Sequence, residues 1–329
     1  MNSRKLLERG YFQKLSNKLE KTTIVGGRYN GQVSDVSKSI INEGDIPLTI
    51  FNAFKLGDSN FELFKRGFDM ITDGDGDETR KILTIHSSSL LALLCFFSVS
   101  ENNPLVIDND EYTEVLFEVK NWVLKKDNRK PSNIDVVLVS KSKDGSIRKL
   151  LFLESKFTEY VSHARVKLAS KYKPFYNYLK EHIKDLQFNA SYFNIRNQDG
   201  KTSEVFGLWA DTPLYLEGIK QAFSHLLGIA TGPAEDKNSY RKIYENYYYR
   251  AEKIEFGTIL HNWNQTEFEN YIDLYHNTFQ HEDIIKKGLI NDLNREIVDR
   301  LKINPEPFMY KKVFEEFKLP GIIREAYKL

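Results

Sequence analysis

Two stretches in the middle of the chain alternate with a period of two, which is typical of β-strands. Residues 134–139 (IDVVLV) and residues 151–156 (LFLESK) are dominated by large apolar side chains with few polar ones between them. Successive side chains of a strand point to opposite faces, so each stretch is predicted to be a strand. Asp144-Gly145 lies between them and is typical of a tight turn. The sequence therefore predicts a β-hairpin.

Charged residues interrupt both of these apolar strands. Asp135 lies in the first, and Glu154 and Lys156 lie in the second. Because residues two apart share a face, Glu154 and Lys156 project together while Ser155 points the other way, and a hairpin can bring Asp135 beside them. Ionisable groups among large apolar side chains are costly unless they are paired or bind a metal. The pattern predicts that two carboxylates and an ammonium group meet at one place.

Further elements are predicted on either side of the hairpin. Residues 90–97 (LLALLCFF) form an apolar run that predicts a buried helix, with a preceding serine as its N-cap. In residues 216–228, apolar side chains recur every three or four positions, which predicts an amphipathic helix. Residues 253–260 (KIEFGTIL) are predicted to add a strand. From about residue 283 onward the pattern is helical and charged, and prolines interrupt it.

Together these elements predict an α/β protein with a mixed central β-sheet flanked by helices. The chain has 329 residues, which exceeds a usual domain of roughly 100–200 residues, so one core with sizeable additions is expected. We expect a mostly helical N-terminal accessory region over 1–85, a core over 86–280, and a C-terminal helical extension over 281–329 that packs on the core.

Net charge and cysteine content add little to this picture. The formal charge is +1, so any contact with nucleic acid must be local. The single cysteine, Cys95, lies in the apolar run 90–97 and is expected to be a buried hydrophobe, which fits a reducing cytoplasm. That run is too short for a membrane-spanning helix of roughly 20 residues. We expect a cytoplasmic protein with no membrane partner.

Two carboxylates beside a lysine suggest a site for a divalent metal ion. In phosphate chemistry, Mg²⁺ is typically held by one or two carboxylates together with water and substrate oxygens. Asp135 and Glu154 can supply the carboxylates, and the backbone carbonyl of Ser155 a third ligand. Lys156 can hold or help deprotonate an attacking water and steady the charge on a phosphoryl group. The alternative is a plain ion pair, since Glu-x-Lys occurs four times in this chain.

The residues Pro131-Ser132-Asn133-Ile134-Asp135 and Glu154-Ser155-Lys156 resemble the signature of the PD-(D/E)XK nuclease superfamily, the fold of many restriction endonucleases and DNA-repair nucleases. Here the proline stands four positions before the aspartate, whereas in the signature the two are adjacent. The resemblance covers about half of the chain, and only the two strands match specifically. It implies a restriction endonuclease-like core and hydrolysis of phosphodiester bonds.

The same resemblance implies further site residues. Members usually carry one more acid ahead of the aspartate, and Glu118 is the matching candidate, with Glu114 and Glu111 as alternatives. Many members also place a glutamine on the helix after the Glu-x-Lys strand, and Gln221 resembles it. The implied catalytic set is Asp135, Glu154, Lys156, Glu118 and Gln221. The implied cofactor is Mg²⁺, with Mn²⁺ able to replace it.

Basic residues gather around the two strands and favour DNA as the partner. Between Lys156 and Lys180 there are six lysines or arginines and one acid, Glu159, and Tyr172, Phe175, Tyr176 and Tyr178 lie among the basic residues. Such a segment attracts a phosphate backbone, although charge runs are more often a solvated surface. The candidate nucleic-acid contacts are Lys120, Arg165, Lys167, Lys171, Lys173 and His225.

The sequence thus favours a metal-dependent endonuclease that hydrolyses DNA, most simply double-stranded DNA, in a restriction-like or DNA-processing role. A homodimer is expected from the resemblance alone. The first alternative is a nucleic-acid-binding module that keeps the fold without cutting. The second is a scaffold in which the strand charges are ordinary ion pairs.

Overall fold

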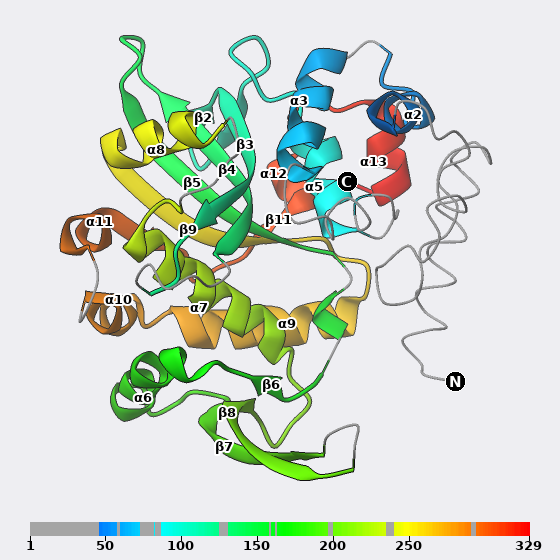
Figure 1. Cartoon of the computed structure of the whole chain (residues 1–329). Coiled ribbons are helices and arrows are strands. Elements are labelled where there is room, and N and C mark those ends of the chain that lie inside the picture. The colour runs from blue at the N-terminus through cyan, green and yellow to red at the C-terminus, as the bar shows by residue number, and fades with distance from the viewer. Residues whose placement is uncertain are drawn as a thin grey trace.

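The centre of the molecule is a mixed β-sheet with helices on both faces (Figure 1). The computed structural model describes residues 46–57, 60–72, 82, 87–124, 131–157, 159–161, 163–196, 200–234, 240–290 and 294–329. Within them the sheet has the order β10-β9-β5-β4-β3, and β11 also pairs with β9. Its strands are β3 (Glu114–Asn121), β4 (Ser132–Lys141), β5 (Ile147–Lys156), β9 (Lys253–Leu260), β10 (Leu301–Ile303) and β11 (Phe308–Met309).

The predicted hairpin is confirmed as β4 and β5, which pair in antiparallel fashion. Gly145 in the connecting turn has a φ of +82°, a left-handed conformation that glycine adopts without a steric penalty. On the outer side of the hairpin, β4 pairs antiparallel with β3. On the inner side, β5 pairs in parallel with β9, the strand predicted at 253–260. The sheet is therefore mixed, as expected.

The two faces of β5 meet different helices. Phe152 packs edge-on against Tyr244 of α8 (Arg241–Arg250), on the face that α7 (Leu216–Thr231) also covers. Ser155 points to the opposite face. There its hydroxyl donates to the carbonyl of Ser88 in α5 (Ser88–Phe96) and lies 2.8 Å from the hydroxyl of Tyr310 in α12 (Tyr310–Val313). The alternation predicted for this strand is therefore observed.

The C-terminal segment, predicted to be a helical extension, also contributes two strands to the central sheet. β10 and β11 both pair in parallel with β9, at the edge of the sheet away from the hairpin. The prediction was incomplete because strands of two and three residues are too short to show a period in the sequence. The helices around them are α9 (Gln265–Phe279), α10 (Glu282–Ile290), α11 (Arg295–Arg300) and α13 (Gly321–Tyr327).

The predicted N-terminal region falls largely outside the described residues. Its described part contains two helices, α2 (Ile46–Ala53) and α3 (Phe61–Thr72), and α3 lies against β3. A small two-stranded sheet of β1 (Leu105–Ile107) and β2 (Asp110–Tyr112) follows α5. Among the helices that the structure describes, none is long and apolar enough to cross a membrane.

A second, smaller sheet lies below α7 and α9 in Figure 1. It has the order β6-β8-β7 and is antiparallel throughout. Its strands are β6 (Val166–Lys167), β7 (Asn189–Arg196) and β8 (Thr202–Trp209). The 3-10 helices η2 (Glu159–Val161) and η3 (Ser170–Tyr172) and the helix α6 (Lys173–His182) belong to the same excursion from the core. This excursion joins the end of β5 to α7.

Gly207 allows β6 to approach β8 closely, and a substitution there tests the small sheet. A Cβ at this position would lie 2.1 Å from the backbone oxygen of Val166. Gly207→Ala should therefore push β6 away from β8 and lower the free energy of unfolding by about 1–3 kcal/mol, as overpacking does. Urea unfolding measures the change. Gly321→Ala is the control, because a Cβ there meets nothing within 4 Å. Equal stability of Gly207→Ala and the wild type would contradict the close approach.

Candidate functional site

The candidate site lies where β4 and β5 separate. Their pairing runs from Lys141 and Ile147 to Val136 and Leu153. One residue further along, the backbone N–H of Ser155 donates to Oδ2 of Asp135 at 2.7 Å. The Asp135 carboxylate thus takes the place of a backbone acceptor at the end of the β4–β5 pairing. This contact places Asp135 directly beside the Glu154-Ser155-Lys156 segment, as the sequence predicted.

Glu154 is the centre of a buried charge cluster. Nζ of Lys156 lies 2.5 Å from its Oε1, and Nε2 of His225 lies 2.8 Å from its Oε2. The three residues are 4%, 3% and 5% exposed, respectively. His225 comes from α7, which covers this face of the sheet. Buried charges in proteins are usually paired in this way or bind a metal.

The two partners of Glu154 set its ionisation. Burial by itself would raise the pKa of Glu154, but the charges of Lys156 and His225 and their hydrogen bonds outweigh burial and lower it to about 2. Burial by itself would lower the pKa of Lys156, but the Glu154 carboxylate outweighs it and raises that pKa well above its usual value. At neutral pH the cluster therefore holds a carboxylate and an ammonium ion.

Asp135 is in a different electrostatic situation. Burial raises its pKa well above the usual value, and the negative charges of Glu154 and Glu118 raise it further. The attraction of Lys156 and the hydrogen bond from Ser155 only partly oppose these effects. Two acids thus repel a third at one place, which is a common feature of functional sites and of sites that take up a cation.

Glu118 is the acid of β3 that lies nearest to Asp135. The neighbouring pairs Phe117–Val136 and Val119–Ile134 place it opposite Asp135 in the sheet. Its side chain is buried, and its backbone has a φ of +49°, the left-handed region that non-glycine residues rarely occupy. Such strain inside a strand tends to occur at functional sites. No pattern in the sequence indicated this conformation.

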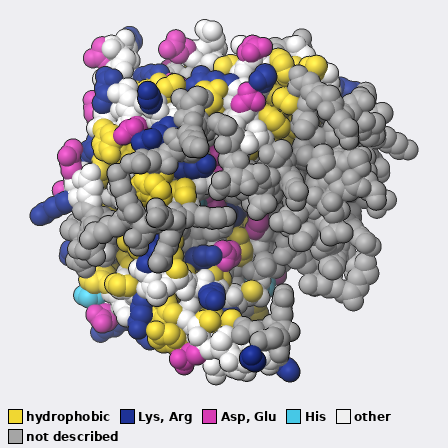
Figure 2. Space-filling view, viewed as in Figure 1, with side chains coloured by type: hydrophobic (Ala, Val, Ile, Leu, Met, Phe, Trp, Pro, Cys, Tyr) yellow, Lys and Arg dark blue, Asp and Glu magenta, His cyan; other side chains and the backbone are white. Residues whose placement is uncertain are grey.

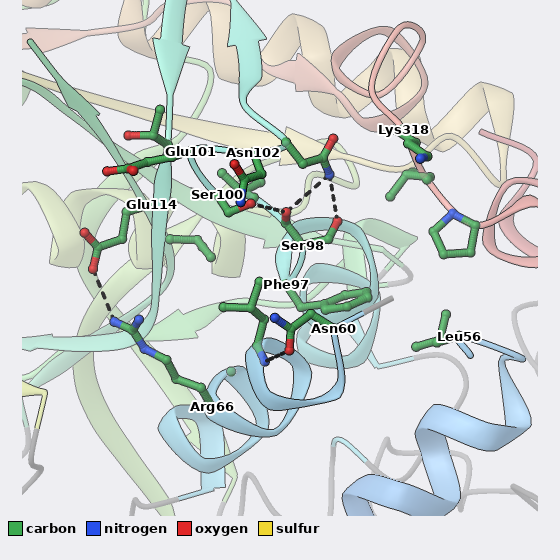
Figure 3. Close-up of a pocket in the computed structure, with 18 of the residues that line it drawn as sticks. Leu56, Asn60, Arg66, Phe97, Ser98, Ser100, Glu101, Asn102, Glu114 and Lys318 are labelled. Carbon is green, nitrogen blue, oxygen red and sulfur yellow. Dashed lines mark hydrogen bonds and ion pairs between the residues drawn. The ribbon is translucent and has the colours of Figure 1, made fainter. Parts of the chain in front are cut away.

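Glu114, one of the two alternatives to Glu118, lies at the other end of β3. It accepts hydrogen bonds from Arg66 at 3.2 Å, from Lys141 at 2.6 Å and from the hydroxyl of Tyr247 at 2.8 Å. These contacts place it on the wall of a separate cavity of about 1080 Å³, shown in Figure 3. The other alternative, Glu111, is exposed on β2. Of the three acids, Glu118 is the one whose charge acts on Asp135.

α7 presents a polar face toward the cluster. Gln221 lies one turn before His225 on this helix, and its Oε1 is buried without a hydrogen-bond partner among the described residues. That oxygen can accept a hydrogen bond from a ligand. The prediction that Gln221 and His225 share a helix face is confirmed. The direct pairing of His225 with Glu154 was not predicted, since His225 was assigned to nucleic-acid contact.

Three buried tyrosines, which sequence reasoning missed, surround the same cluster: Tyr215, Tyr271 and Tyr275. Burial raises the pKa of Tyr271, and the charge of Glu154 adds to the effect. Burial likewise raises the pKa values of Tyr215 and Tyr275. These side chains keep the Glu154–Lys156 pair away from bulk water, which strengthens its electrostatic interaction. Tyrosines at these positions carry no spacing signal that could have singled them out.

The predicted basic contacts divide into two groups. Lys167 is exposed on β6, and Arg165 is exposed just before it. The guanidinium group of Arg165 lies 5.5 Å from the ring centre of Phe193. Lys173 is half-buried near Tyr192. Lys171, in contrast, donates to the backbone carbonyl of Val123 at 3.0 Å, so part of its role is structural. Lys120 is half-buried on β3, two residues after Glu118.

The donor set suits a small, hard cation only in part. Asp135 and Glu154 offer carboxylate oxygens, and a cation between them would relieve the repulsion that raises the pKa of Asp135. Among the described residues, no group of three or more His, Cys, Asp or Glu side chains is placed to hold a metal ion. A metal bound here would therefore rely on two carboxylates, a backbone carbonyl and water.

Comparisons with known proteins do not identify the chain. No family model matches it, and neither the curated proteins nor the solved structures contain a significant match.

Replacing Asp135 by asparagine should stabilise the protein at neutral pH. A pKa raised in the folded state means that ionising Asp135 disfavours folding, and this loss grows as the pH rises above the usual value of 3.8. Asp135→Asn removes the charge while its side-chain oxygen can still accept from Ser155. Thermal unfolding should show a higher midpoint, by roughly 2–4 °C per kcal/mol gained. The gain should shrink as the pH falls toward 4. Asp283→Asn, at an exposed site on α10, is the control. If both variants raised the thermal midpoint equally, Asp135 would not be repelled by its neighbouring acids.

Removing Lys156 should have the opposite effect on stability. Lys156→Ala leaves the Glu154 carboxylate buried with one partner fewer, and breaking a buried pair in this way costs about 3–5 kcal/mol. Lys220→Ala removes a more exposed lysine that pairs with Glu217 on α7, and it should change stability by less than about 1 kcal/mol. Urea unfolding compares the two variants. Similar losses for both would show that the Lys156 pair is not buried.

Proposed function

We propose that this protein is a metal-dependent endonuclease of the PD-(D/E)XK type that hydrolyses DNA phosphodiester bonds. The observation that carries the proposal is the convergence of Asp135, Glu154 and Lys156 at the point where β4 and β5 separate. A mixed sheet with helices on both faces is compatible with such a core. Double-stranded DNA is the proposed substrate, and a homodimer is the proposed assembly.

The charge states of the side chains support a specific division of roles. Lys156 remains protonated at neutral pH because its pKa is raised, so we assign it the role of a cation that orients the attacking water and offsets charge on the phosphoryl group. Asp135 is half-buried and more accessible than Glu154, and it would meet a ligand first. Glu154 already has two ion-pair partners, yet a carboxylate has about four acceptor positions and can still coordinate.

Asp135, Glu154 and the carbonyl of Ser155 would hold Mg²⁺ or Mn²⁺. When bound, such an ion supplies Lewis-acid polarisation of the phosphate and a more acidic water. His225 holds the second oxygen of Glu154 and so fixes the direction in which the carboxylate points. Among the residues that the structure describes, the side-chain oxygen of Gln221 on the same helix face has no hydrogen-bond partner, so it can accept from a water molecule.

A second candidate is a nucleic-acid-binding module that keeps this fold without cleaving. The observation in its favour is that the described residues hold no group of three metal-binding side chains. In that case the Glu154–Lys156–His225 cluster would serve stability, and Asp135 would tie the ends of β4 and β5 together. The two candidates differ in one measurable property, which is cleavage that depends on a divalent metal.

The test is cleavage of supercoiled plasmid and mixed genomic DNA by the purified protein with Mg²⁺, Mn²⁺ or EDTA. We expect nicking and linearisation with the metals and none with EDTA. Asp135→Asn should cleave roughly a hundredfold more slowly while remaining folded, because it removes a metal ligand without opening a cavity. Asp283→Asn is the control and should cleave like the wild type.

Two other results would change the conclusion. Cleavage by Asp135→Asn at the wild-type rate would show that this site is not the catalytic one. Binding of DNA without cleavage under all metal conditions would favour the second candidate. In that case, Mn²⁺ should leave the thermal midpoint of the wild type unchanged, whereas a metal site would raise it by mass action.

A further inference from the structure

The small sheet extends well beyond the part of it that is packed. β6 is two residues long and pairs with β8 at Gly207 and Leu208, next to α7. β7 and β8 continue past this point as a two-stranded ribbon, and in Figure 1 they run along the lower edge of the molecule. We call residues 194–196 and 202–204 the outer ribbon. None of its side chains is buried.

Packing of the hydrophobic core does not account for the outer ribbon. A two-stranded hairpin without a packed face is only marginally stable in water. The outer ribbon adds no residue to the hydrophobic core, so shortening it would remove no core contact. Its side chains are also unlike a buried strand, because Asn194, Arg196 and Thr202 are polar and exposed. A partner that contacts both faces of the ribbon would account for its length.

The charge around the ribbon favours a polyanion as that partner. Residues 163–209 contain eight Lys and Arg against four Asp and Glu, a net charge of +4, whereas the whole chain has +1. Figure 2 shows Lys and Arg side chains on this lower part of the molecule. Arg165 and Lys173 flank the base of the outer ribbon, over the rings of Phe193 and Tyr192. Phosphate groups are the ligands that such a segment attracts.

The shape of the ribbon favours the groove of a duplex over a single strand. The major groove of DNA, about 12 Å wide, admits a two-stranded β-ribbon. Proteins usually bind single strands by stacking the bases on exposed aromatic side chains. Tyr192 is exposed, but Lys173 lies 5.0 Å from its ring centre and Phe206 meets it edge-on. A base would have to displace Lys173 to stack there.

We infer that the outer ribbon enters the major groove of double-stranded DNA and contacts base edges and phosphates there. This inference rests on DNA being the substrate in the proposed function. Asn194 and Arg196 carry the side-chain types that read adenine and guanine in this groove, and Glu204, opposite Asn194, is of the type that accepts from cytosine. α7 links the two sites, because it contacts β6 and β8 and also carries His225.

The test is binding of a short labelled duplex in EDTA, where no cleavage takes place, measured by fluorescence anisotropy over a range of salt concentrations. Asn194→Ala/Arg196→Ala should bind roughly tenfold more weakly, and its preference among duplexes of different sequence should weaken, because both side chains are assigned to base edges. The matched control is Asn246→Ala/Arg250→Ala on α8. Both control residues are exposed, and α8 lies far from the small sheet in Figure 1. The control should bind like the wild type.

Other outcomes separate this inference from the proposed function. If the ribbon variant binds like the wild type, or if the wild type binds a single strand more tightly than the duplex, the inference is overturned, and plasmid cleavage by the wild type still stands. If the ribbon variant loses duplex binding but the wild type never cleaves, the inference is supported and the nuclease proposal fails. Thermal unfolding of both variants should match the wild type, since neither removes a buried side chain.

Discussion

The pairing of Glu154 with Lys156 inside the protein is the interaction on which the rest of the site depends. Two charges with almost no exposure would be prohibitively costly if either were alone. Each one therefore requires the other, and His225 completes the set by binding the second oxygen of Glu154. Because His225 belongs to α7, the pairing also fixes how that helix lies on the sheet. The cluster is thus both a structural constraint and the centre of the candidate site.

The surroundings of Asp135 disfavour its ionised form. The neighbours of Glu154 favour its ionised form, whereas burial and two other acids disfavour the ionised form of Asp135. The left-handed backbone of Glu118 lies next to it in the sheet and adds local strain. A protein that needed only stability would gain by losing one of these acids. Three acids placed side by side are a common feature of functional sites, and a bound cation would relieve the repulsion between them.

The excursion between β5 and α7 connects this site to the small sheet. It leaves the core directly after Lys156, forms β6, α6, β7 and β8, and returns as the helix that carries Gln221 and His225. The residues on both sides of the excursion are therefore those that contact Glu154. A displacement of the small sheet would also move α7, because α7 contacts β6 and β8. α7 therefore joins the small sheet to the charge cluster.

The sequence by itself determined the β4–β5 hairpin, the shared face of Glu154 and Lys156, and the approach of Asp135, because a period of two and a glycine turn are local properties. It also determined the α7 helix and the strand β9. Only the tertiary structure decided that Glu118 and not Glu114 lies beside Asp135, and that His225 binds Glu154. It alone revealed that β10 and β11 join the sheet. These outcomes depend on contacts between distant segments, such as Ser155 with Tyr310, which are 155 residues apart. Alternation along a strand shows which residues share a face, but the partner of that face is set by how the whole chain packs.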